Sequence, residues 1–127
     1  MTRDITPDNR AVVSATQIED ACISAHKALE VLRTILVLIV DVDEAWSADW
    51  SLEKRWTVIK ELDKRIERIA TPTADAVFDA KVCLVAFFSN IYELERIRLG
   101  PVQAGIIRAL NVAGNKVLPV AEALSAD

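Results

Sequence analysis

The sequence contains few residues that interrupt regular structure, with only three Gly and four Pro among its 127 residues. Disordered and low-complexity chains are commonly rich in Gly and Pro, so this composition argues against both classes. The hydrophobic share is 52%, and a chain of this length can bury a core without a disulfide or a metal. We therefore predict a single globular domain over residues 1–127.

Cysteine and histidine are also scarce, at two and one residues. Cys22 and Cys83 lie within apolar helical patterns, which favours reduced, buried thiols over a secreted disulfide framework. Structural zinc needs four ligands at tight paired spacings, and His26 forms no such set with the two cysteines. A nucleophilic triad needs a carboxylate that orients its histidine, and no such partner for His26 is evident in the sequence. We predict no metal, no cofactor and no catalytic residue, and therefore a protein that is not an enzyme.

Long apolar runs and an excess of positive charge are absent as well. The longest apolar run covers residues 35–40, far below the roughly 18 residues of a transmembrane helix. Residues 1–10 are polar, unlike a secretory signal. The net charge of −4 gives no bulk attraction to phosphate, and the basic residues of segment 51–70 alternate with acids. We expect a cytoplasmic protein that binds neither membranes nor nucleic acid.

Four segments carry apolar residues three and four positions apart, the spacing that marks one face of an α-helix, and in the first segment the two intervals alternate strictly. They predict an all-α fold, an antiparallel up-down-up-down four-helix bundle with a long first helix. The main helices are expected over residues 14–42, 51–70, 73–99 and 101–118. Residues 1–13 are expected to be flexible or to form a short lead-in helix, and residues 119–127 to form a tail.

Capping residues support these boundaries. Ser14 and Gln17 can form a capping box at the start of the first helix, and Ser51 can cap the second. Proline cannot continue a helix but suits the first turn of the next one, while glycine suits a helix end. The remaining boundaries are therefore expected at Thr71-Pro72, Gly100-Pro101 and Pro119.

One of these boundaries carries a family resemblance. The segment from Thr71-Pro72-Thr73 to Ala80-Lys81 resembles a Thr-Pro-x-Thr…Ala-Lys helix-start element of uncharacterised small bacterial all-helical proteins. The resemblance covers about eleven residues, and the sequence lacks the glycine expected within the element. It implies a bacterial cytoplasmic helical protein with no associated activity.

The first helix has more apolar surface than one core face requires. With Leu32 at the centre of the core face, Val37 and Leu38 point away from it, so the C-terminal half is apolar on all sides. Such a helix must be covered all round, by its own bundle or by a partner. We predict a partner interface centred on Val37 and Leu38. Trp46 and Trp50 either extend this interface or cap the end of the core.

The leading functional hypothesis is a non-enzymatic helical protein that self-associates or binds another helical protein. The alternative is a helical bundle that binds a small molecule or a lipid in an apolar cavity.

Overall fold

The structure is a computed structural model that describes residues 13–89 and 97–125, with side chains described for residues 13–86 and 97–125. Its α-helices within these ranges are α1 (Ala15–Ile39), α2 (Leu52–Arg68), α3 (Ala74–Ser89) and α5 (Gln103–Ser125). Two short 3₁₀ helices, η3 (Asp43–Ala45) and η4 (Gly100–Val102), precede α2 and α5. No strand occurs in the described ranges, so the predicted all-α four-helix fold is confirmed.

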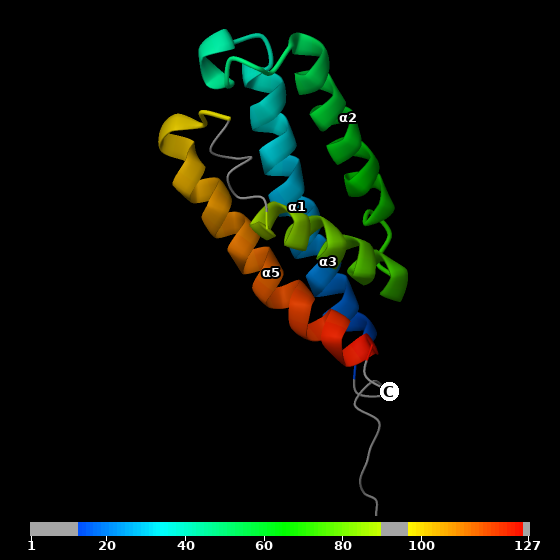
Figure 1. The fold of residues 1–127 in the computed structure, drawn as a ribbon. Coiled ribbons are helices and arrows are strands. Elements are labelled where there is room, and N and C mark those ends of the chain that lie inside the picture. The colour runs from blue at the N-terminus through cyan, green and yellow to red at the C-terminus, as the bar shows by residue number, and fades with distance from the viewer. Residues whose placement is uncertain (1–12, 90–96, 126–127) are drawn as a thin grey trace, which may run out of the picture.

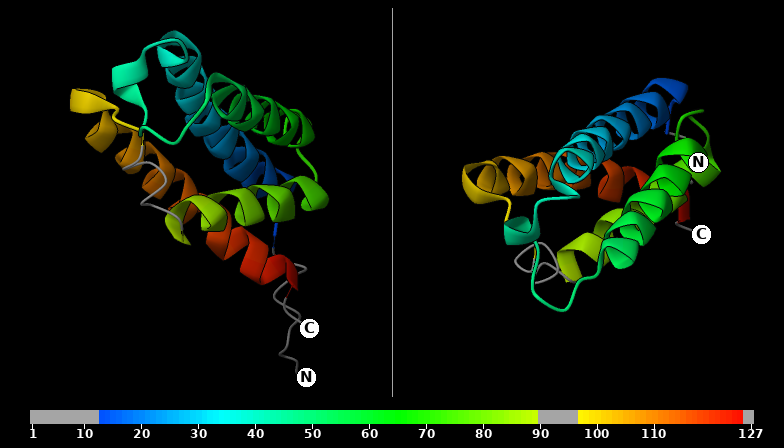
Figure 2. Two further views of the ribbon diagram at one scale, coloured as in Figure 1. Left: turned by 45° about the horizontal axis from the view of Figure 1, so that its top comes forward. Right: turned by 90° about the horizontal axis from the view of Figure 1, so that it is seen from above.

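The long helix α1 organises the bundle, since it contacts α2, α3 and α5. Its most extensive contact is with α5, and these two helices lie side by side and run in opposite directions (Figure 1). Helix α2 returns along another side of α1, while α3 lies obliquely across the bundle (Figure 2). The obliquity of α3 makes the arrangement less regular than four aligned rods.

The core lies between these helices and consists mainly of aliphatic side chains. Leu32, expected at the centre of a core face, is 0% exposed, and so is Leu84 on α3, where the spacing of apolar residues in segment 73–99 also predicts a core position. Alanine supplies much of the remaining core on α1, α3 and α5, and its small side chain lets the helices approach closely. The largest fully buried side chains are Leu29, Leu32, Leu36, Ile59, Ile69, Leu84, Leu110, Val77, Val117, Cys22 and Cys83.

The predicted N-terminal caps of the first two long helices are confirmed. The Ser14 N–H donates to Gln17 Oε1 at 2.8 Å, and the Gln17 N–H donates to Ser14 Oγ at 3.1 Å, which completes the capping box. Ser51 Oγ accepts a hydrogen bond from the Lys54 N–H at 3.2 Å. These bonds satisfy N–H groups that lack partners within the helix.

Helix α1 ends at Ile39, three residues before the predicted end at residue 42. The free carbonyls at its end find donors elsewhere in the chain. The indole N–H of Trp46 donates to the Ile39 carbonyl at 2.9 Å, and Arg55 Nη1 donates to the Val40 carbonyl at 2.9 Å. Donors from later residues therefore replace the continuation of the helix.

The predicted third helix, over residues 73–99, extends too far. Ile97 does not continue a helix, because its backbone forms an antiparallel bridge with Trp46. The Arg98 N–H donates to the Ala45 carbonyl in the same pairing. The pairing joins segments far apart in the sequence and outweighs the local preference of residues 97–98 for helix. Residues 90–96, also part of the predicted helix, lie outside the described residues.

The predicted end of the last helix at residue 118 is also wrong. Helix α5 continues through Pro119 to Ser125. Proline removes the N–H that would bond the Asn115 carbonyl, but both residues are exposed, so water can reach that carbonyl. Ala121, 0% exposed, continues the buried face beyond the proline. The predicted lead-in over residues 1–13 falls outside the described residues except at Val13.

Candidate functional site

The end of the bundle where α1 meets α2 holds a buried cation. Arg55 is 7% exposed and is the only charged side chain that is buried in the described part of the chain. It lies on the α2 face that also carries Ile59 and Leu62. The helical period therefore turns Arg55 inward, toward the end of α1.

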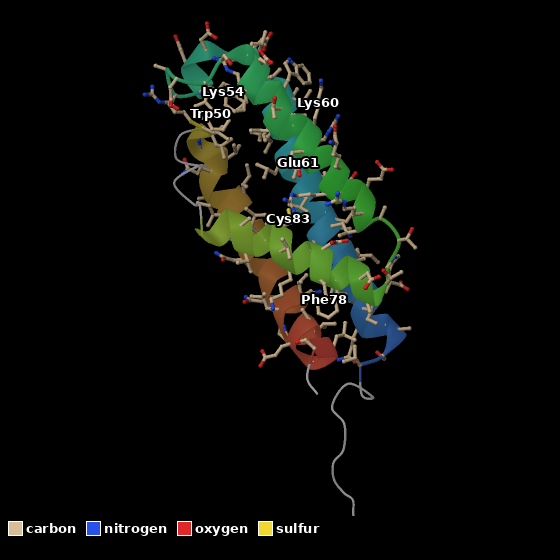
Figure 3. The ribbon with its side chains drawn as sticks, turned by 45° about the vertical axis from the view of Figure 1, so that its right-hand side comes forward. Trp50, Lys54, Lys60, Glu61, Phe78 and Cys83 are labelled. Atoms are coloured by element: carbon tan, nitrogen blue, oxygen red, sulfur yellow. The ribbon has the colours of Figure 1, made fainter. Side chains whose placement is uncertain are left out.

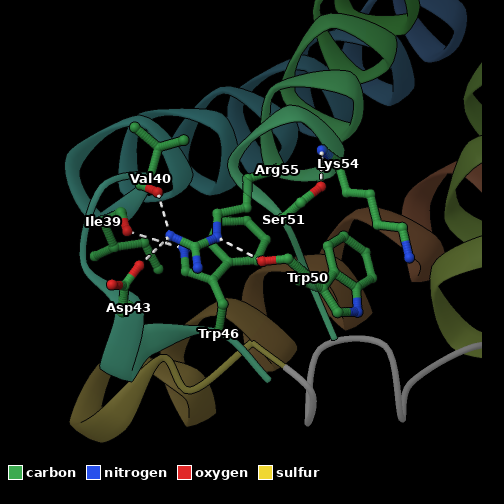
Figure 4. Close-up of polar contacts among 8 residues, drawn as sticks. All are labelled: Ile39, Val40, Asp43, Trp46, Trp50, Ser51, Lys54 and Arg55. Carbon is green, nitrogen blue, oxygen red and sulfur yellow. Dashed lines mark hydrogen bonds and ion pairs between the residues drawn. The ribbon is translucent and has the colours of Figure 1, made fainter. Parts of the chain in front are cut away.

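Arg55 contacts the end of α1 and the connection between α1 and α2 (Figure 4). Besides its bond to Val40, it donates from Nε to the Trp50 carbonyl at 3.1 Å. Nη1 also lies 3.1 Å from Asp43 Oδ1, and the guanidinium lies 5.6 Å from the centre of the Trp46 ring. Through these contacts Arg55 stabilises the connection between α1 and α2.

The four residues predicted as an interface occupy different environments. Trp46 is only 3% exposed, and its ring centre lies 5.6 Å from that of Trp50, which packs against the core. Val37 is half-buried against the core as well, whereas Leu38 is 71% exposed. Trp46 therefore caps the core instead of extending a contact surface, and of the two predicted central residues only Leu38 presents its side chain to solvent.

A different apolar surface lies on the outer side of α1. Val31 is 50% exposed and lies two helical turns before Leu38 on the same side of the helix. Val112, 50% exposed, comes from the neighbouring helix α5. Covering exposed aliphatic side chains with a partner lowers the free energy of the complex. Val31 and Val112 belong to α1 and α5, the two helices in most extensive contact.

A shallow groove runs between α1 and α5 at this surface. Its floor includes small residues, so the two helix backbones leave a depression of about 350 Å³ there. A second hollow continues along α1 past Thr34 and Ile35. The residues that line the first groove are Ser24, Lys27, Ala28, Val31, Gly105, Arg108, Ala109 and Val112. We call this depression the α1/α5 groove.

The α1/α5 groove has a positive border. Lys27 and Arg108 both line it, and neither forms an ion pair with another described residue. The nearby acid Glu30 is already engaged, because its Oε1 lies 2.8 Å from His26 Nδ1. Acidic groups on a partner could therefore pair with two available cations.

The contact between His26 and Glu30 corrects the expectation that His26 has no carboxylate partner. The i to i+4 spacing of the two residues on α1 is the sequence pattern that could have revealed it. Cys22 lies one turn earlier and lines a small hollow with both residues. Burial raises the pKa of the Cys22 thiol, although a hydrogen bond to the Thr73 backbone acts in the opposite direction. No hydrogen bond between Cys22 and His26 occurs among the described residues, so the arrangement of Cys22, His26 and Glu30 gives no sign of a cysteine activated by the histidine.

The second cysteine lies between α3 and α2, near Glu61 (Figure 3). Burial raises the pKa of the Cys83 thiol to about 11, with a smaller lowering effect from Arg65 and a raising effect from Glu61. The thiol therefore stays protonated at neutral pH. Both cysteines are free and buried, as the sequence predicts.

The charged residues of α2 form ion pairs both within the helix and with α1. Arg65 Nε lies 3.6 Å from Glu61 Oε1, and Asp63 accepts a 2.6 Å hydrogen bond from Arg33 of α1. Arg55 is buried, as described above. Two acids of α2 thus lie in ion pairs, Glu61 within the helix and Asp63 with α1.

None of the helices in the described ranges combines the length and apolarity needed to span a bilayer. The same ranges contain no group of three or more His, Cys, Asp or Glu residues suited to a metal ion. No family model, curated protein or solved structure matches the chain. The resemblance at residues 71–81 therefore stays a prediction.

Proposed function

We propose that the chain is a non-enzymatic helical interaction protein that binds a helical partner over the outer side of α1 and the adjoining α5. The observation that carries the proposal is the 71% exposure of Leu38, in line with half-exposed Val31 beside the α1/α5 groove. Leaving such side chains in water forgoes about 1.5 to 3 kcal/mol each. A helix laid along the groove would cover them.

The chemistry of the groove favours a protein partner over a small ligand. A small-molecule site usually encloses most of its ligand, whereas the α1/α5 groove is shallow and open to solvent. Its apolar floor with Lys27 and Arg108 at the border resembles the apolar centre and polar rim of a protein interface. The ligand-binding alternative has no comparable supporting feature. We place this function in the cytoplasm, since free, buried cysteines suit a reducing compartment.

Site-specific photocross-linking tests this function. A photoreactive amino acid replaces Leu38 in one sample and Val82 in another, and cells that express each variant are irradiated. Val82 is a matched control, because it is aliphatic and 59% exposed but lies on α3. We expect a discrete protein adduct from position 38 and none from position 82. Equal labelling at the two positions, or no adduct at position 38, would contradict the proposal.

A further inference from the structure

The outer side of α1 carries a second apolar stripe with the spacing of a coiled-coil seam. Ser24, Ala28, Val31, Ile35 and Leu38 follow one another at alternating intervals of four and three residues. Ala28 is buried and Ile35 packs partly against the core, whereas Val31 and Leu38 are 50% and 71% exposed, so the stripe faces outward mainly at these two positions. Side chains repeated in this way interlock with those of a facing helix.

The same face offers both a projecting side chain and a depression to receive one. Leu38 projects near one end of α1, and the α1/α5 groove lies around Ala28, nearly three turns earlier. The small residues Gly105 and Ala109 form the α5 side of that groove. A leucine from a helix that runs antiparallel to α1 would therefore find room over Ala28.

We propose that the partner is a second copy of this chain, docked with its α1 antiparallel to the first, so that Leu38 of each copy enters the α1/α5 groove of the other. This inference rests on the proposed function and names its partner. In this register Val31 lies beside Ile35 of the second copy. A two-fold axis near Thr34 relates the two contacts, so the interface closes on itself as a dimer.

The charges along α1 select the antiparallel direction. In the register above, Lys27 lies next to Asp41 of the second copy, in the turn that follows α1. Neither residue has an ion pair with the other described residues, so both are available. In a parallel pair the two copies of Lys27 would lie at one level on opposite sides of the seam, about 14 residues away from Asp41, so this ion pair could not form. Opposite charges at such flanking positions set partner orientation in paired helices.

Sedimentation equilibrium of the full chain tests the presence of the dimer. We expect the parent to sediment with twice the chain mass of 14.0 kDa. Leu38→Glu should raise the dimer Kd about 100-fold, because the contact occurs twice in a symmetric dimer. Val82→Glu, which adds the same charge at an exposed position of α3, should leave Kd unchanged. Circular dichroism checks that both variants keep their helix, and Leu38→Ala gives a milder weakening if Leu38→Glu fails to fold.

A charge swap tests the direction of the two helices. Lys27→Glu and Asp41→Lys should each weaken the dimer about tenfold, and the double variant should recover most of the parent affinity. A monomeric parent, an equal effect of Val82→Glu, or a double variant weaker than either single variant would overturn the homodimer. If the parent is monomeric while position 38 still cross-links to another protein, the proposed function stands and only the second copy is excluded.

Discussion

Replacement of Arg55 by methionine should destabilise the chain by about 2 to 4 kcal/mol. Methionine keeps much of the apolar stem but removes donors to the Val40 and Trp50 carbonyls, at 2.9 Å and 3.1 Å. A buried acceptor left without a donor costs about 1 to 3 kcal/mol, a penalty that applies in full to the buried Val40 carbonyl and in part to the partly buried Trp50 carbonyl. The lost cation over Trp46 adds to the penalty, while relief from burying a charge offsets part of it.

Urea unfolding, followed by far-ultraviolet circular dichroism and by tryptophan fluorescence, measures this difference in the free energy of unfolding. Arg55→Lys should lie between the parent and Arg55→Met, because one ammonium group cannot hold both carbonyls in the same geometry. Asp43→Asn should cost less than about 1 kcal/mol, since Asp43 is 91% exposed and water screens its ion pair. A loss below about 0.5 kcal/mol in Arg55→Met, or an equal loss in Asp43→Asn, would refute the role assigned to Arg55.

Two further predictions concern the stability of the chain. Pro119→Ala should stabilise it by about 1 to 3 kcal/mol, because alanine restores an N–H inside α5; an unchanged or lower urea midpoint would show that the proline is accommodated at no cost. The raised pKa of Cys83 means that the unfolded chain loses the thiol proton near the ordinary value of 9.0, while the folded chain keeps it to about 11. The contribution of Cys83 to stability should thus be intact below pH 9 and fall between pH 9 and about 11, a loss that Cys83→Ala should reduce; identical pH profiles for the two proteins would contradict this.

The sequence predicts best those features that depend on neighbouring residues. The caps at Ser14 and Ser51 and the buried positions of Leu32 and Leu84 follow from spacing within a few helical turns. The pairing of Ile97 with Trp46 could not be found in this way, because the two residues lie in separate segments. Non-local pairing depends on how the helices pack, which local spacing does not specify.

The interface residues show the same limit. The apolar character of α1 near its C-terminal end indicates unused surface, but helical spacing alone does not say which side α2 covers. Val37 is half-buried against the core, whereas Leu38 is open. The spacing of Val31, Ile35 and Leu38 was available in the sequence and would have marked the outer stripe. The α1/α5 groove required the structure, since α5 supplies half of its lining.

Disulfide cross-linking on the outer face of α1 tests the central claim most directly, because it reports both contact and direction. Thr34 lies near the proposed two-fold axis and is exposed, so Thr34→Cys should form a covalent dimer under mild oxidation. Lys27→Cys alone should remain uncross-linked, but it should cross-link when mixed with Asp41→Cys. The native cysteines are buried and provide a low background. Efficient self-cross-linking of Lys27→Cys, or no covalent dimer from Thr34→Cys, would contradict an antiparallel pairing of two copies through α1.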